Sequence, residues 1–298
     1  MRYIEAAGRL GSIANAAEEL ALSQSSVSAA IDILAKQLNY DLFIRAPAKG
    51  ISATPSGHAA IQTIRAFLDQ WGHFEAELEA IGGDVSGKLR IACFVTAAGS
   101  FMPPMLRQFQ TDFPNVEIEL HEENMEGVAD LLDEGKVDLA FTYSDVVAPS
   151  HAFEALVDVP PFALVARDSA LAKQDDVSLG ELAAMPMVLL DLNKTRGYYS
   201  RFLTDAGHQV RVAHRTESVE MVRTLVANGF GFSILNARPS EYLAGKSGYR
   251  VMPIREKLKT RSFGILLRAG MRHPMIVRRF VKLCQDLKDQ GIFEGLIV

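Results

Sequence analysis

The segment that decides the fold of the N-terminal region is residues 21–38, ALSQSSVSAAIDILAKQL. Apolar residues recur at helical spacing from Val27 to Leu38, which predicts a helix. Ser23 stands directly before this helix and is of a residue type that caps helix N-termini. Residues 14–20 repeat the helical spacing upstream. The sequence therefore predicts two short helices joined by a tight turn.

The first turn of the second helix carries small hydrogen-bonding side chains and no charge. Free backbone N–H groups and hydroxyls at a helix N-terminus favour a phosphate, and glutamine can reach base edges in the major groove of DNA. This pattern makes the turn a candidate DNA contact, although a plain helical hairpin with a serine-rich cap also fits the spacing. The candidate residues are Ser23, Gln24, Ser25, Ser26 and Ser28.

A pair of short strands is expected after these helices, over residues 42–45 and 51–54, with a turn between them. A further helix start follows at residues 55–57, Pro-Ser-Gly. A strand pair in this position is the wing of a winged helix-turn-helix. The candidate phosphate contacts on the wing are Arg45, Lys49 and Thr54.

A long amphipathic helix is predicted over residues 55–81, with apolar residues at spacings of three and four over about six turns. A lone linker would leave such a stripe exposed to water, so we expect the same helix of a second subunit to cover it. The candidate dimer contacts are Phe67, Leu68, Trp71, Phe74 and Leu78.

From residue 88 onward, short apolar runs alternate with amphipathic segments, which predicts an α/β protein. The change in composition falls at the glycine-rich segment 82–87, GGDVSG, where we expect a hinge. The expected strands cover residues 89–95, 116–120, 137–141, 162–166, 187–190, 232–235 and 263–267.

Polar side chains follow several of these strands where helices begin. Because ligands of open α/β sheets bind beyond the carboxyl ends of strands, such side chains suit a small polar ligand, with a carboxylate as one candidate. Lys194 and Arg196 favour an anion whereas Glu217 opposes one, so the charge of the ligand stays open. The candidate effector-binding residues are Thr96, Ser100, Thr142, Asn193, Thr195 and Ser218.

An ordered series of motifs runs through Gly11-Ser12-Ile13, the segment AAEEL at 16–20, LSQSSVS at 22–28, LFIR at 42–45 and TPSG at 54–57. With this series, residues 8–57 resemble the winged helix-turn-helix of LysR-type transcriptional regulators, and the rest of the chain is similar to the effector domain of that family. The resemblance implies a homodimer or homotetramer that binds double-stranded DNA and senses a small molecule, with RNA polymerase as a further candidate partner.

The resemblance also implies a domain plan. An N-terminal all-α winged helix-turn-helix would cover residues 1–57, a linker helix and hinge residues 58–87, and a periplasmic-binding-protein-like α/β effector domain residues 88–298. Two crossing segments, at 161–165 and 262–266, would divide the effector domain into one half made of residues 88–161 and 268–298, and another made of residues 162–267.

Three features depart from the family pattern. Ser25 stands where proline is common, Ala29 follows Ser28 where a basic residue often stands, and the first helix starts unusually close to Met1. Residues 1–57 hold five basic and five acidic side chains, and the whole chain carries a net charge of −5. A balance without surplus positive charge lowers the expected electrostatic affinity for DNA.

The sequence gives little support for catalysis. It contains no combination of nucleophile, base and metal ligands at the spacing of a known catalytic motif. Cys93 and Cys284 lie far apart and the seven histidines are scattered, so we expect no disulfide, metal or other cofactor.

No apolar run approaches the roughly 18 residues of a membrane span, and a cytoplasmic location is expected. The rival hypotheses are an enzyme on a periplasmic-binding-like fold and a ligand-binding module whose helices bind protein.

Overall fold

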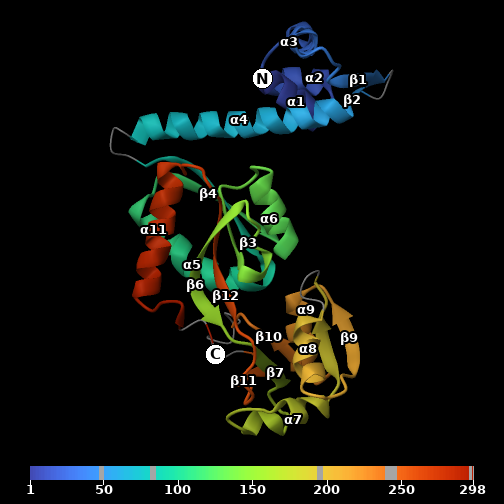
Figure 1. Ribbon diagram of the computed structural model, residues 1–298, viewed down its shortest axis with the longest axis vertical. Coiled ribbons are helices and arrows are strands. Elements are labelled where there is room, and N and C mark those ends of the chain that lie inside the picture. The colour runs from blue at the N-terminus through green and yellow to red at the C-terminus, as the bar shows by residue number, and fades with distance from the viewer. Residues whose placement is uncertain (47–49, 81–84, 193–196, 239–246, 295–296, 298) are drawn as a thin grey trace. The chain divides into compact units, whose positions relative to one another are not determined.

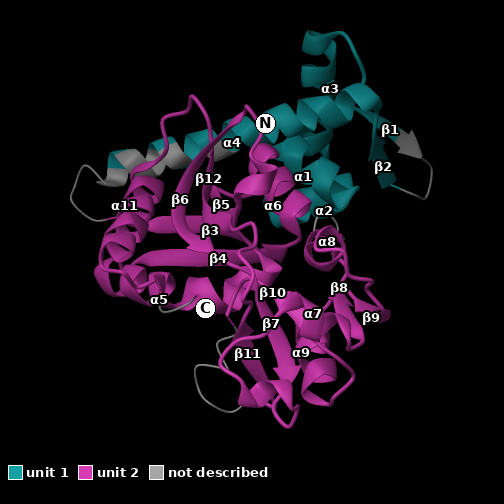
Figure 2. Ribbon diagram, turned by 60° about the horizontal axis from the view of Figure 1, so that its bottom comes forward, with its two compact units in different colours: residues 1–84 teal, residues 85–298 magenta. Residues whose placement is uncertain are grey.

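The computed structural model describes residues 1–298 except 47–49, 81–84, 193–196, 239–246, 295–296 and 298 (Figure 1). The chain divides into two compact units, residues 1–84 and 85–298 (Figure 2). Among the described residues, no helix has both the length and the apolar character needed to cross a membrane.

The first unit is a helical domain with a two-stranded wing. A buried core that includes Ile4, Val27 and Ile61 holds it together. Its elements are α1 (Arg2–Leu10), α2 (Ile13–Glu19), α3 (Gln24–Leu38), β1 (Phe43–Ala46), β2 (Gly50–Ala53) and α4 (Pro55–Ala80). The predicted helices, wing and long helix are confirmed, with ends that differ by one or two residues.

Local sequence signals set the ends of these helices. Ser12 and Ser23 cap α2 and α3 by accepting backbone N–H groups, and Asn39 ends α3 in the left-handed conformation with φ of 60°. Gly57 lies so close to the backbone that an added Cβ would stand 1.9 Å from the carbonyl oxygen of Leu42. Only glycine therefore allows α4 to start against the wing.

The second unit is an α/β structure with two sheet regions. Its first half holds β3 (Gly87–Phe94), α5 (Val95–Asp112), β4 (Val116–Glu123), α6 (Met125–Asp133), β5 (Leu139–Tyr143), η1 (Ser144–Val146), β6 (His151–Val159), β12 (Arg261–Arg268) and α11 (Met275–Asp289). Its second half holds β7 (Phe162–Ala166), η2 (Leu171–Lys173), α7 (Leu179–Ala183), β8 (Met187–Leu190), α8 (Tyr198–Asp205), β9 (Val212–Thr216), α9 (Val219–Ala227), β10 (Ser233–Leu235) and β11 (Tyr249–Pro253).

The strand order of the first half is β4-β3-β5-β12-β6. In the second half β10-β7-β11 form one sheet, and β8 pairs with β9 in parallel. All seven predicted strands are present, but β6, β9 and β11 were not predicted, since their apolar residues are interrupted by polar or charged ones.

The predicted division of the effector domain is wrong at one boundary. Residues 262–267 were expected in the second half, yet β12 pairs along its whole length with β6 and over four residues with β5. The chain has therefore already returned to the first half at Arg261, because backbone pairing rather than sequence position decides to which sheet a strand belongs.

Candidate DNA-binding and effector sites

The N-terminal turn of α3 exposes a compact group of hydroxyls. Ser23 Oγ accepts the backbone N–H of Ser26 at 3.1 Å and lies 2.8 Å from the hydroxyls of both Ser25 and Ser26. The side chain of Gln24 is exposed beside them, whereas Ser28 is half-buried. Four of the five DNA contacts predicted at the start of α3 therefore lie on one exposed turn.

The wing places the other predicted DNA contacts differently. Arg45 lies in β1 and pairs with Ile51 of β2, but its side chain and the whole of Lys49 lie outside the described residues. Thr54 donates its hydroxyl to the carbonyl oxygen of Asp41 at 2.7 Å and accepts the N–H of Gly57 at 2.8 Å. Thr54 thus caps α4, and a phosphate contact by this residue stays a prediction.

An apolar stripe runs along the exposed side of α4. Phe67, Trp71, Phe74 and Leu78, here called the α4 stripe, are 48%, 45%, 51% and 51% exposed. The rings of Trp71 and Phe74 lie 5.8 Å apart. Leu68, the fifth predicted dimer contact, is partly buried against the core of its own unit and lies outside the stripe.

The predicted effector residues fall into four groups. Thr96 and Thr142 are buried, and neither hydroxyl has a hydrogen-bond partner among the described residues. Ser100 donates its hydroxyl to the backbone carbonyl of Arg238, which joins the two halves. Ser218 is exposed and caps α9 by accepting the N–H of Met221. The predicted residues Asn193 and Thr195 lie outside the described part of the chain.

Adjacent strand residues point to opposite faces of a sheet, and this separates Thr142 from Tyr143. Ala140, which shares the face of Thr142, packs with residues of α6, whereas Tyr143 belongs to the core cluster that contains Phe101 of α5. The two side chains therefore cannot line the same side of the sheet, and Tyr143 is the one that faces Arg261.

Arg261, which sequence analysis missed, lies where the two halves meet. Its side chain is 4% exposed, and its Nη2 atom lies 3.0 Å from a carboxylate oxygen of Asp145. The guanidinium carbon is 3.3 Å from the ring centroid of Tyr198 and 5.7 Å from that of Tyr143. Its Nε and Nη1 atoms have no hydrogen-bond partner among the described residues. The only sequence signal is a basic residue directly before an apolar strand.

Tyrosine rings lie close to this guanidinium. Burial raises the pKa of Tyr143 well above its usual value, although the nearby positive charge of Arg261 and the Thr96 hydroxyl oppose the increase. Burial likewise raises the pKa of Tyr199 and of the half-buried Tyr198. All three hydroxyls are therefore protonated at neutral pH and can donate hydrogen bonds.

A cavity of about 670 Å³ opens beside Arg261. Asp145, Tyr198 and Arg261 line it together with further residues of α8 and the segment 256–259. Its volume lies in the range of about 300–1,000 Å³ that is typical of small-molecule sites.

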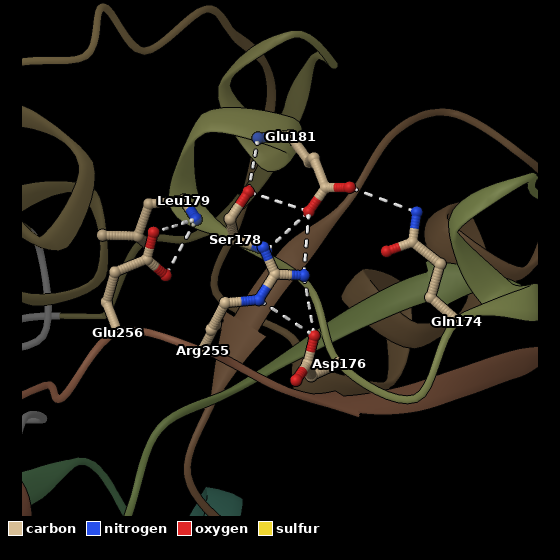
Figure 3. A network of polar contacts seen from close by, with 7 residues as sticks. All are labelled: Gln174, Asp176, Ser178, Leu179, Glu181, Arg255 and Glu256. Carbon is tan, nitrogen blue, oxygen red and sulfur yellow. Dashed lines mark hydrogen bonds and ion pairs between the residues drawn. The ribbon is translucent and has the colours of Figure 1, made fainter.

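A polar network holds one wall of the cavity in place (Figure 3). Glu256 accepts the N–H of Leu179 with both carboxylate oxygens, at 3.0 and 3.1 Å, and Arg255 contacts Asp176 at 2.8 Å. Glu181 accepts both the N–H and the hydroxyl of Ser178, each at 2.8 Å. These contacts fix segment 255–259 to the start of α7.

The same network predicts a pH effect. The two hydrogen bonds from Ser178 lower the pKa of Glu181 from 4.5 to about 2. The carboxylate therefore stabilises the fold above pH 4.5, and this contribution is lost as the pH falls from 4.5 towards 2. We expect Glu181→Gln to lower the urea midpoint at pH 6 and to lower it less at pH 3. An equal decrease of the urea midpoint at both pH values would contradict the assignment of a lowered pKa to Glu181.

Neither cysteine has the environment of a reactive thiol. Cys93 and Cys284 are both fully buried, and burial raises the pKa of Cys93 well above its usual value. Since the thiolate is the reactive form, the structure gives no support for a redox role of Cys93. In the part of the chain that is described, no three His, Cys, Asp or Glu side chains lie together as metal ligands would.

Residues 82–289 match the family described as "LysR substrate binding domain", and residues 1–58 match "Bacterial regulatory helix-turn-helix protein, lysR family". The chain belongs to the LysR family of transcriptional regulators. It therefore combines a DNA-binding helix-turn-helix with a substrate-binding domain, as its motifs predict.

Relatives of this LysR regulator match it over most of their length. The RuBisCO operon transcriptional regulator of Allochromatium vinosum is 29% identical over 81% of this chain and 80% of its own. A LysR regulator structure from Pseudomonas aeruginosa is 28% identical, covers 97% of both chains and has a TM-score of 0.62. Full-length CbnR in complex with its target DNA is 21% identical, covers 96% of this chain and 97% of its own, and has a TM-score of 0.68, which shows a shared fold.

Proposed function

We propose that this LysR regulator binds operator DNA as a homodimer or homotetramer and senses a small polar molecule where the halves of its effector unit meet. The observation that carries the sensing role is the buried guanidinium of Arg261, which lines the cavity and has two nitrogen atoms without a hydrogen-bond partner among the described residues. Buried polar groups are nearly always paired, so unpaired nitrogen atoms on a residue that lines a cavity favour a ligand that completes their hydrogen bonds.

In this proposal the exposed turn of α3 enters the major groove. Gln24, Ser25 and Ser28 face the bases, Ser23 and Ser26 support the turn, and Arg45, Lys49 and Thr54 contact phosphates from the wing. The DNA complex of CbnR, which has the same fold, supports a nucleic-acid partner. Because that partner is chromosomal DNA, the proposed location is the cytoplasm.

The proposal assigns oligomerisation to the α4 stripe and no catalytic step to any residue. A ligand bound at the junction would change the relative stability of two arrangements of the halves, and thereby the spacing of the DNA-binding units. A contact with RNA polymerase would pass this change to transcription.

The decisive experiment is to sequence the genomic DNA fragments that the purified protein retains. The most tightly bound fragment is then footprinted with and without small molecules that stabilise the protein against thermal unfolding. We expect a short list of fragments with a shared dyad and a footprint that changes with the bound molecule. Retention without sequence preference, or conversion of the bound molecule into a product, would contradict the proposal.

Gln24→Ala is expected to reduce discrimination between the selected fragment and random DNA by about tenfold, because a bidentate side-chain contact to a base is worth about 1–3 kcal/mol. Nonspecific affinity should stay nearly unchanged, since phosphate contacts dominate it. Fluorescence anisotropy with the selected fragment and with random DNA, at several salt concentrations, measures both the discrimination and the nonspecific affinity.

Gln37→Ala is the matched control, because Gln37 is exposed near the other end of the same helix. Equal discrimination by the wild-type protein and the Gln24→Ala variant would show that another residue reads the bases.

A further inference from the structure

The C-terminal part of the effector unit contains a long segment without acidic residues. Residues 257–285 hold eight lysine and arginine side chains and no aspartate or glutamate, in a chain whose net charge is −5. The structure divides these basic side chains between two places, because β12 carries the chain along the whole length of β6. Lys257, Lys259 and Arg261 line the cavity before and at the start of β12, and the other five follow from its far end onward.

Four arginines gather where β12 ends and α11 begins, and they are here called the α11 patch. Only residues 269–274 separate the two elements, so the arginines on either side of this connection stay close to one another. Arg278 and Arg279 are exposed on α11, and Arg272 is exposed in the connection. Arg278 also reaches back, because its Nη1 donates to the carbonyl oxygen of His273 at 2.7 Å. The members of the patch are Arg268, Arg272, Arg278 and Arg279.

Little negative charge balances the α11 patch. Among the described residues, no ion pair involves Arg268, Arg272 or Arg279. A carboxylate nearby, Asp133, contacts His151 at 2.8 Å, and His151 is the residue of β6 that pairs with Arg268. Protein surfaces ordinarily mix charges of both signs, and a surface of one sign attracts partners of the opposite sign. The α11 patch is therefore a candidate binding surface for a polyanion.

The acidic side chains of the first half lie elsewhere. Residues 112–138 hold ten aspartate and glutamate residues and one lysine, and they include β4, the strand at the opposite edge of the sheet from β6. An acidic surface of this kind on a second copy is one conceivable partner for the α11 patch. However, Glu117 and Glu119 of β4 already contact Lys88 of their own chain, at 3.1 and 2.9 Å. These contacts favour a partner other than a second copy.

The α11 patch lies at the end of the sheet where the chain enters the effector unit. Strand β3 begins at Gly87, directly after the DNA-binding unit, and runs parallel to β5. Strand β12 runs antiparallel to β5, so it ends where β3 begins. The α11 patch therefore belongs to the end of the effector unit that is covalently attached to the DNA-binding unit.

We propose that the α11 patch contacts the phosphate backbone of the operator DNA. This inference rests on the proposed function and adds the effector unit to the DNA-binding surface. The N-terminal unit needs such a contribution, because residues 1–57 hold five basic and five acidic side chains. Guanidinium groups suit the role, since their planar N–H donors can bind two phosphate oxygens at once.

The first experiment measures the salt dependence of DNA affinity for the full-length protein by fluorescence anisotropy, with the selected fragment and with random DNA. The patch variant is Arg272→Gln/Arg279→Gln, and Arg272→Lys/Arg279→Lys keeps the charge. Arg167→Gln/Arg211→Gln is the matched control, because it removes two exposed arginines from the second half. Circular dichroism verifies that each variant folds, and sedimentation reports its oligomeric state.

We expect the patch variant to bind both DNAs about tenfold more weakly at roughly 0.1 M salt, because each phosphate contact contributes about 0.9 to the slope of log affinity against log salt concentration. Its slope should be shallower by about two for each protomer that contacts DNA. Discrimination between the two DNAs should stay unchanged, since phosphate contacts carry no sequence information. The lysine variant and the control should keep the wild-type slope to within about one unit.

The second experiment locates the contact. Both native cysteines are buried, so a thiol-reactive iron–EDTA reagent labels only an introduced cysteine. We expect the label on Arg272→Cys to cleave the selected fragment at discrete backbone positions, and the label on Arg167→Cys to leave it intact. Absence of cleavage from position 272, or equal cleavage from both positions, would overturn the inference.

Three further results would also overturn it. They are an unchanged slope in the patch variant, an equal change in the control, and a smaller assembly in the patch variant, which would show that the partner is a second copy. The proposed function fails separately, when wild-type protein retains no fragment with sequence preference. The salt slope on random DNA still tests the α11 patch in that case.

Discussion

Phe74→Asp is expected to yield monomers that no longer bind a palindromic operator fragment. The α4 stripe leaves four large apolar side chains about half exposed, with Trp71 and Phe74 in ring contact at its centre. Contiguous apolar patches of this kind mark interaction surfaces. An aspartate at the centre of a buried interface has neither water nor a partner, a loss of several kcal/mol for each copy. A dimer of micromolar affinity has only about 8 kcal/mol in total.

Sedimentation at micromolar concentration and anisotropy with a palindromic fragment measure the two effects. Gln62→Asp introduces the same charge at an exposed position of α4 outside the stripe and should remain dimeric. Leu68→Asp is unsuitable as a test, because Leu68 packs against the core of its own unit. A Phe74→Asp protein that sediments as wild type does would remove the basis for assigning the interface to α4.

The N-terminal unit could be predicted well because its signals are local. Three signals each determine structure within a few residues: a cap at Ser23, helical periodicity over α3 and α4, and a turn between two short apolar runs. The position of Leu68 could not be predicted in the same way. Helix α4 carries apolar residues both towards the unit core, such as Ile61 and Ile64, and along the stripe. Periodicity alone does not separate two adjoining apolar faces.

In the effector unit, strands could be predicted where a short segment is apolar throughout or alternates apolar and charged residues, as residues 116–120 of β4 do. Strands β5, β7 and β8 are buried at every residue and stand out in the sequence. Strand β9 alternates exposed and half-buried residues and includes His214 and Arg215, so its period-two signal is weak. The site at Arg261 depends on packing with Tyr198 and Asp145, which lie far away along the chain. Before folding, an isolated arginine gives no sign that it will be buried.

Asp138→Ala is expected to lower the melting temperature of the effector unit by roughly 10 °C. The Asp138 side chain is 1% exposed, accepts the backbone N–H of Arg90 at 2.8 Å and pairs with the Arg90 guanidinium at 2.8 Å. These bonds join β3 to the residue before β5 at the centre of the first sheet. Breaking a buried ion pair from one side costs about 3–5 kcal/mol, which is a large part of the roughly 5–15 kcal/mol that holds a domain folded.

Asp176→Ala is the matched control, because it removes the same carboxylate from a pair with Arg255 in which both side chains are about half exposed. Exposed pairs contribute at most about 1 kcal/mol, so this variant should melt within a few degrees of wild type. Calorimetry of the full chain distinguishes the two, and Asp138→Ala should leave the transition of residues 1–84 in place, since that unit has its own core. If both variants melt alike, the Arg90–Asp138 pair stabilises the sheet no more than a surface contact does. The stability of the first half would then rest on its aromatic core, where Phe101 stacks on Phe263 at 4.4 Å.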